Sequence, residues 1–412
     1  MRRACLITLL SLLCAENVAR ASTIEQDFPT EGTFHWGPFR VRPFLLLRDT
    51  GYDSNVFLED GTATSDFTST GEGGLKMFSL FRERGAVQVE EVLDYVWYAS
   101  NGSLSHFNNT FRSRGAYYFK PGVVFAEATL LSLRERPSTE IDYRVRRYER
   151  TFGTGWRFVW PHTGLQFRLG DDLYNYETGP GGENIPKALN RVEKRITVTG
   201  TRQLLPKTTL LLEWEATRID FVEGDDLDSS SRRISTGFQL DPSAFIKGSV
   251  KGGYETLEPD TSFLKDFRGF VGDAALVYRF SGLTSLAVRG QRQVAFTTAL
   301  NNLYYLDDSY GATLAQVLAE RVAGEVGIDR QKVDFPVDTA ACATVVCDRS
   351  DPAQFVQGHR TDRLRSYFVG ANYRFSNLTR IGLRLGVWER DSSFDFLNRH
   401  RMTAQVIYAY NF

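Results

Sequence analysis

Long apolar runs are missing from this chain. Beyond its first 21 residues, nothing approaches the roughly 18 consecutive apolar residues that a membrane-spanning helix needs. The mean hydropathy is -0.29, a value typical of a water-soluble protein. These features exclude a helical membrane protein. They leave open a membrane protein built of strands, because water-facing residues dilute the apolar ones in such a chain.

One short apolar segment stands at the start. Arg2 and Arg3 precede the apolar residues 6–13, and Ala19-Arg20-Ala21 offers a small-x-small cleavage site. This pattern predicts a secretory signal peptide over residues 1–21, since the apolar segment is too short to span a bilayer. Cys14 would suit a lipoprotein instead, although the Leu13 before it is bulky where a small residue is wanted. We therefore expect an exported mature chain, residues 22–412, folded as one domain.

Cysteine and histidine are scarce. Two of the four cysteines lie in the signal segment, which leaves Cys342 and Cys347 in a polar segment. In an oxidising compartment this spacing favours a small loop disulfide over a metal site, because two thiols without nearby histidine do not complete a zinc site. The five histidines show no metal-ligand spacing. The sequence thus predicts no metal and no cofactor.

Excess charge is absent as well. The formal net charge of -1 becomes -3 when the three arginines and one glutamate of the signal segment are removed (-1 - 3 + 1). Such a chain has no overall attraction to nucleic acid, so we expect no nucleic-acid partner. The cations are nevertheless uneven, with 40 arginines against 9 lysines.

What the chain does have is alternation. Its C-terminal end places apolar side chains at every second position: Met402, Ala404, Val406, Tyr408, Tyr410 and Phe412. A strand with this pattern has one apolar face and one mostly polar face. An alternating strand that ends in phenylalanine resembles the closing strand of bacterial outer-membrane barrels. That resemblance implies that Tyr410 and Phe412 are an assembly signal and that the barrel-assembly machinery is a partner.

The same alternation repeats along the whole mature chain. Eight short turns, rich in Pro, Gly, Asn and Asp, join alternating runs in pairs near residues 83, 121, 162, 207, 242, 282, 320 and 377. Nine longer polar segments separate the pairs, at about 51–64, 100–105, 136–141, 177–187, 222–229, 258–264, 298–304, 334–358 and 391–396. These connections predict an all-β fold, a transmembrane antiparallel up-and-down barrel of about 18 strands, with 16 as the alternative. A short helix remains an alternative to the turn near Glu320.

Two features indicate that the apolar faces point outward. An 18-stranded barrel encloses a lumen too wide for side chains to fill, and the polar set is rich in charge. Aromatic residues also gather near the short turns, as in the interfacial girdle of a membrane barrel: Tyr117, Tyr118, Phe119, Phe158, Trp160, Tyr278, Phe280, Tyr373, Phe375, Tyr408, Tyr410 and Phe412. We therefore expect the protein in a bacterial outer membrane, surrounded by lipid and lipopolysaccharide.

The segment Gly51-Tyr52-Asp53-Ser54-Asn55-Val56-Phe57 carries a family resemblance. It is similar to the Tyr-Asp-x-Asn-Val segment near the start of the putative β-barrel porin 2 family. With a barrel of this length and the terminal Phe412, the resemblance covers nearly the whole mature chain. It implies an outer-membrane pore: some members look like the exit of exopolysaccharide secretion systems, and others are called porins. It brings no catalytic residues. Asp53 and Asn55 themselves suit a strand-ending turn, where their side chains bond nearby backbone.

Alternation assigns one set of charged residues to the lumen. Its members are Arg112, Arg114, Arg147, Glu149, Arg157, Arg168, Arg195, Glu213, Glu215, Arg233, Lys247, Lys251, Asp273, Arg279, Arg289, Arg374, Arg384, Arg399 and Arg401. Arginine dominates this set, and guanidinium groups bind carboxylate, phosphate and sulfate. A pore lined in this way would concentrate anions. The alternative is that Arg–Glu ladders brace the wall without selecting a solute.

Other chemistry is weakly signalled. Ser105 and His106, with Asn108 close by, leave a lipid-modifying barrel enzyme as a distant alternative. Such an enzyme requires a nucleophile and a base within hydrogen-bond reach of each other. The acidic segments 170–172 and 223–228 are expected to be solvated loops. The second segment lacks the spacing of a calcium loop.

Together these observations predict a monomeric, passive outer-membrane pore and not an enzyme. The expected substrate is an exported, anionic exopolysaccharide, with periplasmic polysaccharide-export proteins as further partners. The main alternative is a general or anion-preferring porin for small solutes. Residues 334–358 are the loop that we expect to fold inward and constrict the pore.

Overall fold

The computed structural model describes residue 32 and residues 34–411, apart from 62, 82, 181–184, 224, 242–244, 300–301 and 343–354. The predicted signal peptide, Cys347 and Phe412 lie outside the described residues, and so does the side chain of Cys342. The predicted disulfide therefore stays a prediction.

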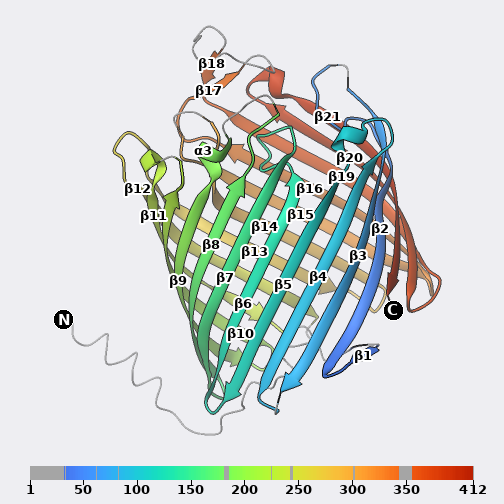
Figure 1. Ribbon diagram of the computed structural model, residues 1–412, viewed down its shortest axis with the longest axis vertical. Coiled ribbons are helices and arrows are strands. Elements are labelled where there is room, and N and C mark those ends of the chain that lie inside the picture. The colour runs from blue at the N-terminus through green and yellow to red at the C-terminus, as the bar shows by residue number, and fades with distance from the viewer. Residues whose placement is uncertain are drawn as a thin grey trace.

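One antiparallel sheet holds nineteen of the strands in the described part of the chain. The first, β1 (Phe34–Trp36), is a short strand that folds back on β2. The other eighteen form a closed barrel (Figure 1), which confirms the predicted strand number. They are β2 (Phe39–Asp53), β3 (Asp66–Phe81), β4 (Gly85–Tyr98), β5 (His106–Phe119), β6 (Gly122–Glu135), β7 (Val145–Val159), β8 (Thr163–Tyr176), β9 (Arg191–Leu205), β10 (Thr208–Phe221), β11 (Ser229–Leu240), β12 (Ile246–Pro259), β13 (Phe267–Arg279), β14 (Thr284–Phe296), β15 (Tyr304–Ala319), β16 (Val322–Asp334), β19 (Thr361–Arg374), β20 (Thr379–Ser392) and β21 (Arg399–Asn411).

The barrel closes between its first and last long strands. β2 pairs with β21 from Phe44 opposite Asn411 to Asp53 opposite Thr403, with a shift in register between Leu47 and Thr50. Closure leaves the sheet no open edge, so the backbone of both strands is satisfied where water is absent.

Short turns and longer loops alternate along the chain, as the sequence predicts. Only Glu320 and Arg321 separate β15 from β16, so the helix considered there is wrong. The short turns lie at one end of the barrel, which we call the short-turn end. The loops, with α3 (Ile185–Leu189) and the hairpin of β17 (Thr339–Cys342) and β18 (Phe355–Gly358), lie at the other, the loop end (Figure 1).

The remaining helical elements are short. The 3-10 helices η1 (Gly102–Leu104), η2 (Asp225–Leu227) and η4 (Asp395–Leu397) each occupy a loop. No helix in the described part of the chain is long and apolar enough to cross a membrane.

Large apolar side chains point out of the barrel. In β10, Leu212 and Trp214 are 52% and 44% exposed, while the intervening Glu213 contacts Lys251 on the inner face. A soluble barrel would bury the apolar set instead. This inverted arrangement confirms that the outer face is the lipid-facing one.

The predicted aromatic girdle is mostly present. Tyr117, Tyr278 and Phe280 are exposed near the short turns. Tyr118 is an exception, because it is buried inside the barrel among Phe78, Val123 and Phe125. Successive residues of a strand face opposite sides, so neighbouring tyrosines at 117 and 118 cannot both reach the lipid.

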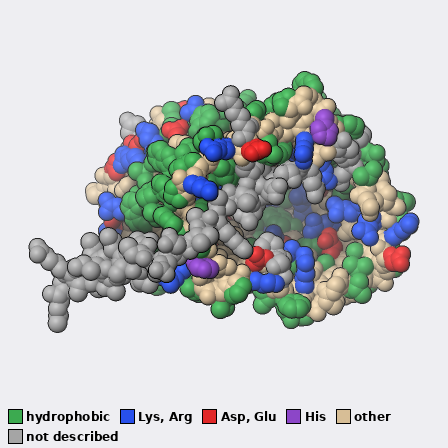
Figure 2. All heavy atoms as spheres, turned by 90° about the horizontal axis from the view of Figure 1, so that it is seen from below, with side chains coloured by type: hydrophobic (Ala, Val, Ile, Leu, Met, Phe, Trp, Pro, Cys, Tyr) green, Lys and Arg blue, Asp and Glu red, His purple; other side chains and the backbone are tan. Residues whose placement is uncertain are grey.

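The lumen is filled at the loop end. One cluster joins Ile141 and Val145 to Tyr176 and α3, and others surround Phe267 with Tyr304 and Phe335 with Tyr305. Seen from the short-turn end (Figure 2), the molecule is hollowed, and Lys, Arg, Asp and Glu side chains surround the hollow. Any functional site should therefore lie where this charged hollow meets the filled end.

Candidate functional site

Residues 136–144, between β6 and β7, lie across the loop end of the lumen; we call them the crossing loop. The Asp142 carboxylate accepts hydrogen bonds from Arg390 of β20 at 2.8 Å and from Arg399 of β21 at 3.0 Å. Glu140 reaches another sector of the wall, where it accepts from Thr297 Oγ1 at 2.6 Å and from the Thr298 backbone N–H at 2.8 Å. The loop is thus anchored on several walls at once.

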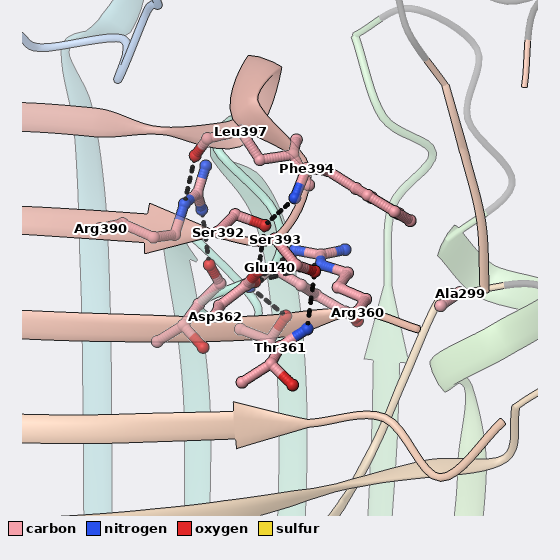
Figure 3. Close-up of polar contacts among 12 residues, drawn as sticks. Glu140, Ala299, Arg360, Thr361, Asp362, Arg390, Ser392, Ser393, Phe394 and Leu397 are labelled. Carbon is pink, nitrogen blue, oxygen red and sulfur yellow. Dashed lines mark hydrogen bonds and ion pairs between the residues drawn. The ribbon is translucent and has the colours of Figure 1, made fainter. Parts of the chain in front are cut away.

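Buried hydrogen bonds hold the Arg390 side chain in the barrel wall. The Arg390 Nε donates to the carbonyl oxygen of Leu397, and its Nη1 donates to that of Thr139 in the crossing loop, each at 2.8 Å. Figure 3 shows Arg390 beside a second buried ion pair, between Arg360 and Asp362, at the loop ends of β19 and β20. Each charge here is paired or hydrogen-bonded, as buried charges must be.

Residues 343–354 of the segment 334–358, which the sequence predicts to constrict the pore, lie outside the described residues, so that prediction stays a prediction; among the described residues, the crossing loop lies across the lumen. Phe335 is fully buried beside Tyr305, and the hairpin of β17 and β18 stands at the outermost part of the loop end (Figure 1). The crossing loop is held inside by Ile141, which packs against Tyr176 of β8 and α3, and by Asp142, whose partners lie on the distant strands β20 and β21.

A cavity of about 410 Å³ lies beneath the crossing loop. Pro137 and Ser138 of the crossing loop line it, together with the inner faces of β8 to β12, β14 and β15 and the end of α3. Its charged lining consists of Arg191, Arg195, Arg233, Glu193, Glu215 and Glu255, and its aromatic lining of Tyr174, Tyr176, Phe296 and Tyr305.

The charges of this cavity are paired. Arg195 lies 2.9 Å from Glu193 and 3.3 Å from Asp172, and Arg233 lies 3.1 Å from Glu215. With three arginines and three glutamates in the lining, the cavity has no net charge. It offers many donors and acceptors but no excess of cation.

Arg191 links the charged and aromatic parts of the lining. It pairs with Glu193 at 2.8 Å, and its guanidinium lies 4.1 Å from the ring centroid of Tyr174 and 4.6 Å from that of Phe296. Cation–π contacts of this kind fix both the cation and the rings. The cavity therefore presents ring faces beside fixed hydrogen-bonding groups.

The structure places the predicted lining residues on the inner face of the strands. Several are in ion pairs with acids: Arg147 with Glu135 and Glu149, Arg168 with Glu127, Lys251 with Glu213 and Asp273, Arg289 with Asp329, and Arg401 with Asp53. Arg384 lies over the ring of Phe368, and Arg374 donates to the Glu320 carbonyl. Their role in lining a conducting pore stays a prediction.

Sequence reasoning missed several residues of the cavity. Glu193 and Arg191 share a face with Arg195, and Glu255 shares one with Lys251. Period-two alternation could have found these residues, because it was the signal that found their neighbours. No local signal marks Arg390 or Asp142, whose importance comes only from their meeting in space.

The family motif ends β2 as expected. The Asn55 backbone N–H donates to Asp53 Oδ1 at 3.1 Å, which confirms the strand-ending turn. The motif also closes the barrel, because Arg401 of β21 donates to both carboxylate oxygens of Asp53, at 2.9 and 2.6 Å. The Asn55 amide adds a bond to the His400 carbonyl at 3.1 Å.

The enzyme alternative lacks the required geometry. Ser105 Oγ accepts the Tyr98 backbone N–H, and His106 Nδ1 contacts the Leu104 carbonyl oxygen at 2.6 Å. Within the described residues no hydrogen bond joins Ser105 to His106, so this pair does not form a nucleophile and its base.

The acidic segment 170–172 is part of β8 rather than a solvated loop. Asp171 pairs with Arg150 on the outer face at 3.4 Å, whereas Asp172 is buried beside Arg195. The other segment, 223–228, lies in a loop as expected. Among the described residues, no group of three or more His, Cys, Asp or Glu could hold a metal ion.

Comparison with solved structures finds similar chains, two of the following three being named outer membrane proteins. OccAB3 of Acinetobacter baumannii aligns with 90% of this chain and 99% of its own at 11% identity, with a TM-score of 0.48. OpdK of Pseudomonas aeruginosa aligns with 90% and 98% at 10% identity, with a TM-score of 0.47. OprD of the same organism aligns with 90% and 93% at 10% identity, with a TM-score of 0.44. A comparison with curated proteins found no match.

The family comparison is decisive. The family model described as putative beta-barrel porin 2 matches residues 31–409, which include all eighteen barrel strands except the last two residues of β21. The apolar outer face, the charged hollow and this match together identify an outer-membrane β-barrel porin. The chain belongs to the putative beta-barrel porin 2 family.

Proposed function

We propose that this porin is the outer-membrane exit channel for an exopolysaccharide that carries acidic groups. The observation that supports it most is the cavity beneath the crossing loop, where aromatic rings and fixed guanidinium and carboxylate groups line one space. Sugar rings have apolar faces that stack on aromatic side chains and hydroxyls that both donate and accept hydrogen bonds. Arg191, Arg195 and Arg233 would receive the acidic groups.

The charged lining continues from the cavity toward the short-turn end. Lys251 bridges Glu213 and Asp273 at 3.4 and 3.8 Å, and Arg168 pairs with Glu127 at 2.8 Å. A chain of sugars could exchange hydrogen bonds along this ladder without a deep binding minimum. Conduction of any solute requires such weak, repeated sites.

The crossing loop supports an exporter over an always-open pore. It is tied to β20 and β21 through Asp142 and to the β14–β15 loop through Glu140. A polymer can leave only when these ties open, and a dedicated secretion system would need such a closed resting state. Periplasmic polysaccharide-export proteins are the partners that we propose for this opening.

A porin for small solutes is the second candidate. The balanced charge of the cavity favours it, because a lining without net charge discriminates little between ions. The volume of about 410 Å³ also suits a small molecule. This reading predicts a pore that conducts steadily with the crossing loop in place.

Single-channel recording of the refolded full chain in a planar bilayer separates the two candidates. We expect low or flickering conductance that acidic oligosaccharides, added on the short-turn side, interrupt for longer than neutral oligosaccharides of equal length. Arg191→Gln with Arg195→Gln should remove this difference. Arg150→Gln, on the outer face, is the matched control. A steady open channel that ignores both oligosaccharides would refute the exporter and favour the small-solute porin.

A further inference from the structure

Two arginines of the crossing loop share a single acceptor. Arg136 Nη2 and Arg144 Nη1 each donate to the carbonyl oxygen of Val56, both at 2.9 Å. Two guanidinium groups on one oxygen must lie side by side. Like charges this close repel each other unless an anion lies nearby.

No carboxylate among the described residues forms an ion pair with either arginine; Asp142 favours the charge of Arg136 and Asp53 that of Arg144 only from a distance. Asp53, the nearest acid of the family motif, is fully engaged by Arg401 through both of its oxygens. Neither Arg136 nor Arg144 forms an ion pair with any described residue. Arg144 instead lies over the Tyr98 ring, 5.4 Å from its centroid, a contact that does not neutralise charge.

The wider surroundings are also cationic. Asp142 Oδ2 forms ion pairs with both Arg390 and Arg399, so its single negative charge is already shared by two cations. Its contact with Arg136 is through the backbone, since Arg136 Nε donates to the Asp142 carbonyl oxygen at 2.6 Å. Positive charge therefore exceeds negative charge on this side of the crossing loop.

The titration of Arg136 agrees with a missing counter-charge. The pKa of Arg136 is lowered to about 9, chiefly by burial and then by the positive charges of Arg144 and Arg401, while the Asp142 carboxylate opposes the shift. Burial also lowers the pKa of Arg144. Arg136 therefore remains protonated at neutral pH.

The site is built and open to a small ligand. Val56 is completely buried, and its turn is fixed by the Asn55 side chain, which exchanges hydrogen bonds with the backbone of Glu59 at 2.9 and 3.0 Å. Arg136 and Arg144 themselves are only partly buried. Their remaining N–H groups, Nη1 of Arg136 and Nε and Nη2 of Arg144, form no hydrogen bond with any described residue. The Val56 carbonyl therefore fixes the two guanidinium groups, and their remaining N–H groups are left available to a ligand.

We propose that Arg136 and Arg144, held by the carbonyl of Val56, form a binding site for one oxyanion: phosphate, sulfate or carboxylate. The planar forks of two guanidiniums match the oxygens of such a group. The inference goes beyond the proposed function and stands without it, because a porin for small solutes would carry the same site. The family motif would then have a second role, because the carbonyl of its Val56 positions the two arginines.

The test uses the full chain, refolded in detergent free of lipopolysaccharide. Its unfolding temperature is measured as sulfate replaces chloride at constant ionic strength. We expect sulfate to stabilise the wild-type barrel, and Arg136→Gln with Arg144→Gln to weaken this response by about tenfold or more in sulfate concentration. Arg146→Gln is the matched control, because Arg146 of β7 donates to the Phe107 carbonyl on the outer side.

Two results would overturn the site: no sulfate response in the wild type, or an undiminished response in the double variant. If the glutamine variant fails to fold, Arg136→Lys with Arg144→Lys keeps the charge and loses the fork. That variant should bind sulfate more weakly than the wild type, and equal binding would also count against the site.

The same measurement distinguishes the natural sources of the oxyanion. Micelles that contain lipopolysaccharide supply lipid phosphate, and a hexuronate oligomer supplies the carboxylate of a polymer. Stabilisation that depends on the two arginines by either probe supports the site and names its ligand. If neither probe protects the wild type while sulfate does, the ligand is a free inorganic anion.

Discussion

Arg390 and Asp142 are 248 positions apart in the sequence, and their side chains are joined at 2.8 Å. The Arg390 side chain has no exposed surface. A charge removed from water in this way depends on its partner, because an unpaired buried charge is strongly destabilising. This one contact therefore couples the position of the crossing loop to the stability of the barrel wall.

Asp142→Asn should loosen the crossing loop. The substitution removes the charge that Arg390 and Arg399 share while keeping the size of the side chain. We expect the single-channel conductance to rise. We also expect the free energy of unfolding in urea to fall by about 2 kcal/mol, a typical worth for hydrogen bonds to a charged group.

The control for this experiment is Asp171→Asn. That change removes a carboxylate from the exposed pair with Arg150, so both quantities should stay near their wild-type values. Unchanged conductance in Asp142→Asn would show that the ion pair does not hold the crossing loop closed.

The ion pair of Asp53 and Arg401 should stabilise the closure of the barrel between β2 and β21. Asp53 is 2% exposed, and Arg401→Gln would leave its carboxylate buried without a partner. We expect the free energy of unfolding to fall by about 3–5 kcal/mol. Tryptophan fluorescence during unfolding in urea measures it.

A double-mutant cycle isolates this interaction. Asp53→Asn combined with Arg401→Gln should lose less stability than the sum of the single changes. Lys194→Gln is a suitable comparison, because Lys194 pairs with Asp220 at the exposed surface and should contribute no more than about 1 kcal/mol. If the losses in free energy of unfolding at Asp53 and Arg401 are additive, the closure between β2 and β21 does not depend on their contact.

The fold was readable from the sequence because its signals are local. Each strand carries its own period of two, and each short turn its own turn-forming residues, so strand number needs no knowledge of distant partners. Tyr118 shows where this reading failed. Composition near a turn placed it in the girdle, whereas alternation with Tyr117 places it inside.

The site was much less readable, because it is made of contacts between distant segments. Alternation tells which face a side chain takes, but not its partner. It identified Arg195 as inward-facing, yet it did not show that Glu193 and Asp172 engage it. The crossing loop was missed for the same reason, since its anchor Arg390 lies on a strand near the other end of the chain.

Ion selectivity should depend on the acids that pair with the cavity arginines. Glu193→Gln combined with Glu215→Gln leaves Arg233 without its ion-pair partner and leaves Arg195 with Asp172 alone. We expect the anion-to-cation permeability ratio to rise by roughly two- to tenfold, because an unpaired cationic lining concentrates anions. The reversal potential under a salt gradient measures this ratio.

Glu258→Gln provides the comparison for selectivity. Glu258 pairs with Arg268 in an exposed position, so its loss should leave the reversal potential unchanged. Equal shifts in both variants would mean that the cavity does not determine selectivity.

The anion site of the crossing loop should weaken at high pH. In the folded protein Arg136 loses its proton near its lowered pKa of about 9, while the unfolded chain keeps the proton up to the much higher ordinary pKa of an arginine. The unfolded state binds more protons in this window, so deprotonation favours the folded barrel as it removes half of the site. We therefore expect the stabilisation by sulfate to be large at about pH 7 and small at about pH 10.

Sulfate is the suitable probe because its own charge is constant over this range. The single variant Arg136→Gln should respond weakly to sulfate at both pH values. A wild-type response that is equally large at both would show that Arg136 does not carry the anion.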